Sequence, residues 1–288
     1  MIIQVGCVDS SVASLPLNDS KQICSYLKTI QLITFPMLQS PWYYPLLFLI
    51  GIVAGLVDSI AGGGGLITLP ALLATGLPPA LALGTNKLQS SFGSLTAAHH
   101  FTHKKFVSVR DARMGIAFTV AGAAIGTWTV QHISPHVLDN VIPIMLAAII
   151  IYSFFVPKFG HVDTHPRLAR APFYIMAGLA FGFYDGFFGP GVGSFWTIAL
   201  ILGLGMNILK ATGYTKVLNF SSNVVALTVF AIGGNVLVSV GLCMGAGQII
   251  GARIGSGLVI YKGARFVRPV FLAMVIATTL KLIWSRFF

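Results

Sequence analysis

Hydrophobic residues along this chain form long runs separated by short polar stretches. Several runs approach the roughly 20 residues that a helix needs to cross about 30 Å of hydrocarbon. Two runs, 63–76 and 192–205, are too short to span and are interpreted as half-helices or re-entrant segments. The complete set of runs is 42–60, 63–76, 79–101, 113–132, 137–156, 172–188, 192–205, 209–232, 238–260 and 266–285. This pattern predicts an all-α polytopic membrane protein with about 8–10 hydrophobic segments, some of them short or broken.

Composition supports a membrane setting, with 56% hydrophobic and 9% charged residues and a mean hydropathy of +0.86. An ordinary soluble domain is roughly one quarter charged. The net charge of +11 is interpreted as cytoplasmic loop charge, because the basic residues gather in loops and form no aromatic-interleaved face for nucleic acid.

The chain contains an internal repeat. The segment GIVAGLVDSIAGGGG at 51–65 recurs as GLAFGFYDGFFGPGV at 178–192, so that Asp58 and Asp185 match at one offset of 127 residues (185 minus 58). The duplication divides the chain into an N-terminal extension, two transmembrane repeats and a basic cytoplasmic linker between them. The predicted boundaries are 1–41 for the extension, 42–157 for the first repeat, 158–171 for the linker and 172–288 for the second repeat.

Loop charges predict that the two repeats have inverted topology. In the first repeat the loop 103–113 is basic and the next, at 134–136, carries no Lys or Arg. In the second repeat the order reverses, since 233–235 is uncharged and 261–265 is basic. By the positive-inside rule the repeats then lie upside down relative to each other, with both termini outside the cytoplasm.

The glycines have two interpretations. Those spaced four apart, such as Gly51 with Gly55, fit close packing of helix backbones. The clusters at 62–65 and 189–193 cannot continue a stable helix in lipid, and such backbone is tolerated around a protected cavity. There, free N–H groups from Leu66 and Ser194 onward would favour an anion. The cluster residues assigned to substrate binding are Gly63, Gly64, Gly191 and Gly193.

An acid stands four residues before each cluster. Asp58 and Asp185 lie inside apolar segments, where an ionised carboxylate is costly. One interpretation is structural, with each carboxylate accepting hydrogen bonds from the N–H groups of its break. The other is functional, with one or both binding a proton or cation that is coupled to transport.

Each repeat also places a lysine deep in its third segment. Lys87 and Lys216 lie roughly 10–13 Å from the start of their helices, near the bilayer midplane. They begin polar stripes that should face the protein interior. Either each lysine forms a structural pair with a nearby aspartate, or the lysines neutralise a small anion. The stripe residues predicted to bind the oxygens of that anion are Ser90, Ser91, Asn219 and Asn223.

Other motifs carry less information. The three cysteines form no CxxC pair and no metal-type spacing, and the histidines of HHFTH at 99–103 are interpreted as interfacial residues rather than metal ligands. No GxxxxGK[ST] motif indicates ATP binding. Gly255-Ser256-Gly257 is similar to a nucleophile turn, yet the sequence places no His or Asp at an identifiable partner position. We therefore expect no cofactor, no metal and no enzymatic activity.

Residues 1–41 differ from the rest, since they contain no apolar run of spanning length and no signal-peptide pattern. They are a mobile extension, an amphipathic surface helix around 23–33, or the product of an upstream start codon with Met37 as the true start. The sequence leaves these three alternatives open.

The chain resembles the TauE/SafE group of membrane transporters, and most closely its bacterial YfcA-like branch. The resemblance covers about residues 43–285. It is carried by GLVDSIAGGGGLITLP at 55–70, ALGTNKLQ at 82–89, GFYDGFFGP at 182–190, and Lys210-Ala211-Thr212 through Asn219. It implies an inner-membrane exporter or permease of sulfite, sulfoacetate or related sulfur-containing anions. The unequal glycine clusters depart from a perfect duplication, and no paired transmembrane cysteines support thiol exchange with a sulfur substrate.

The sequence therefore predicts a secondary transporter of small anions, with the site at the interface of two inverted repeats. Alternating access would rock one repeat against the other. Proton or cation coupling and a homo-oligomeric state are left open. A passive anion channel and, less favoured, an intramembrane enzyme are the competing interpretations.

Overall fold

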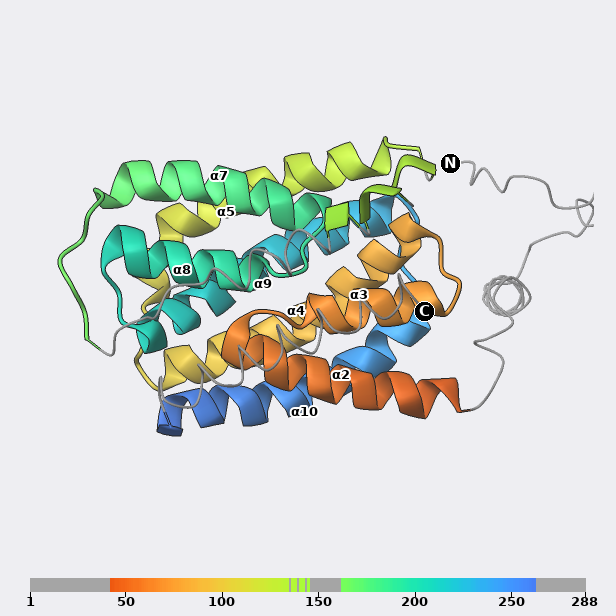
Figure 1. Cartoon of the computed structure of the whole chain (residues 1–288), viewed down its shortest axis with the longest axis horizontal. Coiled ribbons are helices and arrows are strands. Elements are labelled where there is room, and N and C mark those ends of the chain that lie inside the picture. The colour runs from red at the N-terminus through yellow and green to blue at the C-terminus, as the bar shows by residue number, and fades with distance from the viewer. Residues whose placement is uncertain (1–41, 135, 139, 143, 146–161, 263–288) are drawn as a thin grey trace, which may run out of the picture.

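The computed structural model describes residues 42–134, 136–138, 140–142, 144–145 and 162–262, and all regular secondary structure within these ranges is helical (Figure 1). The helices are α2 (Tyr43–Ala61), α3 (Gly65–Ala74), α4 (Pro79–His103), α5 (Val109–Gln131), α7 (Arg170–Phe187), α8 (Val192–Leu204), α9 (Ile208–Ile232) and α10 (Val238–Lys262). The all-α prediction is confirmed. The predicted segments 137–156 and 266–285 lie largely outside the described residues, as does the extension 1–41.

Within the described ranges, four helices are long and apolar enough to cross a membrane, namely α2, α5, α9 and α10, while α3 and α8 are shorter apolar helices. The two short helices match the predicted half-helices. In Figure 1, α3 turns back toward the end of the molecule where α2 begins, and α8 turns back in the same way after α7. The inverted orientation of the two repeats in a membrane stays a prediction.

Local sequence explains where the helices stop and start. The α2 helix ends at Gly62, whose φ of 76° is the left-handed conformation that a residue with a Cβ rarely adopts. Pro79 occupies the first turn of α4, where its missing N–H leaves no bond unmade. Asn207 caps α9 by accepting a hydrogen bond from the Lys210 N–H at 3.0 Å. These signals limit each element to the length that its apolar run suggests.

The two repeats are interleaved by packing. The first helix of the first repeat, α2, packs on α10 of the second, and the first helix of the second repeat, α7, packs on α5 of the first, while α4 and α9 meet between them. Glycines make these approaches close. A Cβ at Gly51 would lie 2.4 Å from the Met244 carbonyl oxygen, and one at Gly126 would lie 2.1 Å from that of Phe183. The prediction that regularly spaced glycines bring helix backbones together is confirmed.

Basic residues gather at one end of the molecule, where α4 ends, α5 and α7 begin and α10 ends (Figure 1). There the Lys104 Nζ lies 5.9 Å from the centre of the Tyr261 ring, and Lys210 pairs with Asp163. The described Lys and Arg residues at this end are Lys104, Lys105, Arg110, Arg113, Arg167, Arg170, Lys210 and Lys262. The helix ends on the opposite side carry no Lys or Arg among the described residues.

The described part of the linker, 162–169, is hydrogen-bonded to the turn between α8 and α9. The Thr164 N–H donates to the Gly205 carbonyl oxygen at 2.7 Å, and the Asn207 N–H donates to Asp163 Oδ1 at 2.7 Å. The hydrogen bond from Lys210, followed by that from the Asn207 backbone, lowers the pKa of the Asp163 carboxyl below its ordinary value. The linker therefore fixes the position of the turn between α8 and α9.

Candidate functional site

The two helix breaks meet each other in the centre of the molecule. A Cβ on Gly62 would lie 2.4 Å from the Gly193 carbonyl carbon, and one on Gly65 would lie 3.0 Å from the Pro190 Cα. The Ser194 hydroxyl at the start of α8 donates to the Ala61 carbonyl oxygen at the end of α2, at 2.9 Å. Because the first break belongs to one repeat and the second to the other, this contact lies at the interface between repeats.

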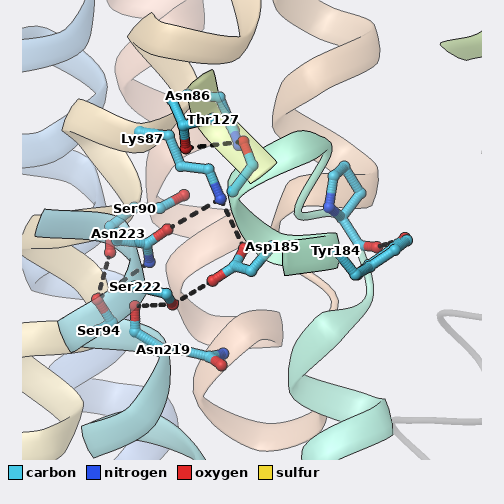
Figure 2. A network of polar contacts seen from close by, with 12 residues as sticks. Asn86, Lys87, Ser90, Ser94, Thr127, Tyr184, Asp185, Asn219, Ser222 and Asn223 are labelled. Carbon is cyan, nitrogen blue, oxygen red and sulfur yellow. Dashed lines mark hydrogen bonds and ion pairs between the residues drawn. The ribbon is translucent and has the colours of Figure 1, made fainter. Parts of the chain in front are cut away.

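Lys87 of α4 pairs with Asp185 of α7 across that interface. The Lys87 Nζ lies 2.6 Å from Asp185 Oδ1, and the side chains are 1% and 3% exposed. The Asn223 amide oxygen accepts a longer bond from the same ammonium at 3.4 Å, and the Ser222 hydroxyl donates to Asp185 Oδ2 (Figure 2). The carboxylate therefore has a partner on each oxygen, which a buried charge requires.

Lys216 of α9 forms the corresponding pair with Asp58 of α2. The Lys216 Nζ lies 2.9 Å from Asp58 Oδ2, and it also donates to the Asp58 backbone carbonyl oxygen. The other carboxylate oxygen of Asp58 accepts the Gly64 N–H of its own break at 3.3 Å. Here the lysine side chain is 0% exposed, whereas the aspartate side chain is 20% exposed. The two pairs thus have the same construction but unequal access.

A small cavity of about 30 Å³ lies between the breaks and the lysine-bearing helices. That volume holds about one or two water molecules. The Asn219 amide oxygen, at the edge of this cavity, is buried without a hydrogen-bond partner among the described residues. The cavity is lined by Asp58, Gly62, Gly65, Asn86, Lys87, Ser90, Asp185, Gly189, Gly191, Val192, Asn219 and Asn223.

The predicted site residues are only partly brought together at this cavity. Lys87, Ser90, Asn219, Asn223 and Gly191 line it. Lys216 reaches it through Asp58, and the remaining glycines, Gly63, Gly64 and Gly193, lie in the breaks beside it. The Ser91 hydroxyl instead donates to the Lys87 carbonyl oxygen of its own helix, at 2.7 Å.

The prediction of free N–H groups from Leu66 and Ser194 onward is wrong for these two residues, which lie in the first turns of α3 and α8. The Leu66 N–H donates to the Gly63 carbonyl oxygen at 3.0 Å, and the Ser194 N–H donates to that of Gly191 at 3.0 Å. Both are tight bonds to the third residue back, which often satisfy the first turn of a helix. Asp58 does accept a hydrogen bond from the Gly64 N–H of its own break, the contact that the structural interpretation expects.

Several residues of the site were not predicted. Ser222 stands three residues after Asn219 on the same helix face, so the polar stripe already contained the signal for it. The Tyr184 hydroxyl donates to the Pro190 carbonyl oxygen at 2.7 Å and holds the second break in place. A polar chain also links α3, α4 and α10, in which Gln89 bonds to Thr68 and Asn86 and accepts from Gln248.

The enzyme interpretation requires one correction. No partner for Ser256 could be identified from the sequence, but the structure places His100 Nδ1 2.8 Å from its hydroxyl oxygen. That hydroxyl also donates to the Ala252 carbonyl oxygen of its own helix, at 2.7 Å. His100 is therefore buried against α10, whereas His99 and His103 lie on the surface of α4 with their ring centres 6.0 Å apart.

The sequence model of the family described as "Sulfite exporter TauE/SafE" matches residues 47–282, which is most of the chain. The chain belongs to the TauE/SafE family. The TauE/SafE match includes both breaks, both buried lysines and both aspartates. The chain is a membrane transporter of this family, with several apolar helices of the kind that span membranes.

Curated relatives agree with the TauE/SafE assignment. The chain is 43% identical over 246 residues to the "Probable membrane transporter protein YfcA" of Escherichia coli (strain K12), covering 85% of this chain and 91% of the relative. It is 43% identical over 241 residues to a "Probable membrane transporter protein" of Haemophilus influenzae, covering 84% and 94%. YjnA of Bacillus subtilis, also described as a probable membrane transporter protein, is 26% identical over 254 residues. No solved structure matches the chain significantly.

Proposed function

We propose that this TauE/SafE protein is a secondary transporter of small anions of the sulfite or sulfonate type, with its binding site at the cavity between the two breaks. The supporting observation is the pair of buried lysines, each neutralised by a carboxylate from the other repeat. The basic end of the molecule faces the cytoplasm of the inner membrane, in accord with the positive-inside rule.

Binding proceeds by exchange of the lysine's counter-ion. A buried ammonium needs a negative partner, and in the closed arrangement that partner is an aspartate. A substrate anion takes over the lysine when the carboxylate leaves, and the carboxylate takes up a proton so that the cavity gains no net charge. The asparagine side chains around the cavity then donate to the anion's oxygens. Anion and proton therefore move together.

The unequal exposure of the two aspartates indicates which pair opens first. Both aspartates line the cavity and have a partner on each carboxylate oxygen, but the side chain of Asp185 is 3% exposed whereas that of Asp58 is 20% exposed. The Lys216–Asp58 pair is therefore the one that exchanges its counter-ion, and the Lys87–Asp185 pair holds the repeats together. This assigns proton coupling to Asp58 and a mainly structural role to Asp185.

The size of the cavity requires movement during transport. The cavity is small, about 30 Å³, and both lysines are occupied by carboxylates, so the breaks must separate before an anion takes the place of a carboxylate. The two breaks belong to different repeats, and so do Lys216 and Asp58. Rocking of one repeat against the other therefore opens the cavity and separates Lys216 from Asp58. Such motion is alternating access.

The proposal is tested by thermal stabilisation of the purified protein with sulfite, thiosulfate, sulfoacetate, taurine and non-sulfur carboxylates. A ligand at 100 times its Kd adds about 2.7 kcal/mol to stability. Sulfur-containing anions should raise Tm in the wild type, and Lys216→Ala should abolish the increase. Lys210→Ala, on the same helix but at its exposed end, is the matched control and should keep it. Equal shifts in all three proteins would refute the proposed site.

A passive anion channel shares the same buried lysines and is distinguished by energetics. In proteoliposomes an imposed proton gradient should drive sulfite above its equilibrium concentration if the protein is a coupled transporter. A channel would only equalise the concentrations.

A further inference from the structure

A second concave surface lies on the side of the molecule, away from the central cavity. It is an apolar groove of about 520 Å³ between α4 and α5, with α9 as its floor. The two walls barely touch each other, whereas both pack on α9. The groove residues are Leu95, Ala98, His99, Thr102, Val109, Ile116, Val120, Val217, Phe220, Ser221, Val224 and Val225.

The groove is separate from the transport site. From α9, Asn219 and Asn223 line the central cavity, whereas Val217, Phe220 and Val224 line the groove. These sets lie on different faces, so the body of α9 stands between the two spaces. An apolar space of this size facing the lipid side calls for an apolar occupant.

The groove has the length of one lipid chain. Along α5 it extends from Val109 to Val120, and eleven residues at 1.5 Å each give about 16 Å. Half of a hydrocarbon core about 30 Å thick is about 15 Å. The groove therefore runs from one membrane surface to about the midplane.

Its outer end is positively charged. Arg113 is exposed and stands four residues after Val109 and three before Ile116, so it lies on the face of α5 that lines the groove. His99 and Thr102 line the same end from α4, close to Lys105 at the start of the following loop. Among the described residues, Lys87, Lys210 and Lys216 form salt bridges and Arg113 forms none.

We propose that this groove is a binding site for one anionic phospholipid, with an acyl chain along α9 and the phosphate at Arg113. The arginine donates to the phosphate oxygens, and its flexible stem reaches the interface from one turn inside the helix. A second copy of this chain is a poorer occupant, because a twofold contact here would bring the basic residues of two copies together.

The test is native mass spectrometry of the purified, delipidated full chain after addition of phosphatidylglycerol or phosphatidylcholine with identical acyl chains. The wild type should bind one phosphatidylglycerol preferentially. Arg113→Gln should lower that occupancy about five-fold, the effect of one cation near an anionic surface. Arg170→Gln, which removes an exposed charge at the same end from α7, is the control and should bind like the wild type.

A groove-filling variant, Val224→Phe, gives a second reading that does not depend on charge. It should lower the binding of both lipids while the melting temperature stays within a few degrees of the wild type. Equal binding of the two lipids by the wild type would overturn the proposal, as would unchanged phosphatidylglycerol binding by both Arg113→Gln and Val224→Phe. A dimer that loses its partner in Val224→Phe would assign the groove to a second copy instead.

Discussion

Neutralising the Lys87–Asp185 pair should show how much the pair contributes to the stability of the protein. Both side chains are at most 3% exposed and the charged atoms lie 2.6 Å apart. Removing one partner leaves the other buried and unpaired, which costs about 3–5 kcal/mol, whereas replacing both is often close to neutral. We therefore expect Lys87→Met and Asp185→Asn each to lose stability in this range, and the double variant to lose much less than their sum.

The free energy of unfolding should be measured in mixed detergent–SDS micelles by intrinsic tryptophan fluorescence, with the four proteins forming a double-mutant cycle. Asp185→Asn should be the milder single change, because Asn223 still accepts a hydrogen bond from the lysine. A coupling free energy of several kcal/mol is expected. If the two single effects simply add, the pair does not hold the repeats together, and the reasoning is refuted.

Three further outcomes follow from the geometry. Gly62→Ala should prevent correct folding, because its Cβ would collide with the backbone of the second break. The control Gly76→Ala has a similar positive φ but open space around it, so it should cost only about 1 kcal/mol of stability. Size-exclusion profiles and Tm in detergent measure both effects. The pKa of Asp163 is lowered in the folded state, from an unfolded pKa near 3.8. The stabilisation by its carboxylate is therefore present above the unfolded pKa and is lost as pH falls through the folded pKa. The Tm difference between wild type and Asp163→Asn should shrink below pH ~4, and a difference that grows there would contradict the assignment. A serine-reactive fluorophosphonate should fail to label Ser256, whose hydroxyl is buried and donates to its own helix, and labelling lost in Ser256→Ala would favour an enzyme.

Much of the fold was predictable because local chemistry decides it. The two breaks follow from glycine clusters that no helix in lipid can contain. The structure places the first break at Gly62 and the second at Gly189 and Gly191, and all three glycines have positive φ. The polar stripes on α4 and α9 were predictable from helical spacing, and their lysines are buried. Periodicity and turn chemistry act over a few residues, so they can be read directly.

The pairing of charges was not predictable in the same way. A pair between each lysine and a nearby aspartate was one of two alternatives, and the sequence did not show which aspartate meets which lysine. The partners are 98 and 158 residues apart, and only the interleaving of α2 with α10 and α5 with α7 brings them together. The N–H groups of Leu66 and Ser194 are hydrogen-bonded because the first turn of each half-helix is tight, and composition does not reveal that tightness.

The most direct test of the account is uptake of radiolabelled sulfite into proteoliposomes under an imposed proton gradient. Wild-type protein should accumulate sulfite above equilibrium. The double variant Lys216→Met/Asp58→Asn removes both charges of the exchanging pair, should remain folded, and should show no uptake. Sulfite accumulation by that folded variant at the wild-type rate would contradict the central claim that a buried lysine exchanges its aspartate for the transported anion.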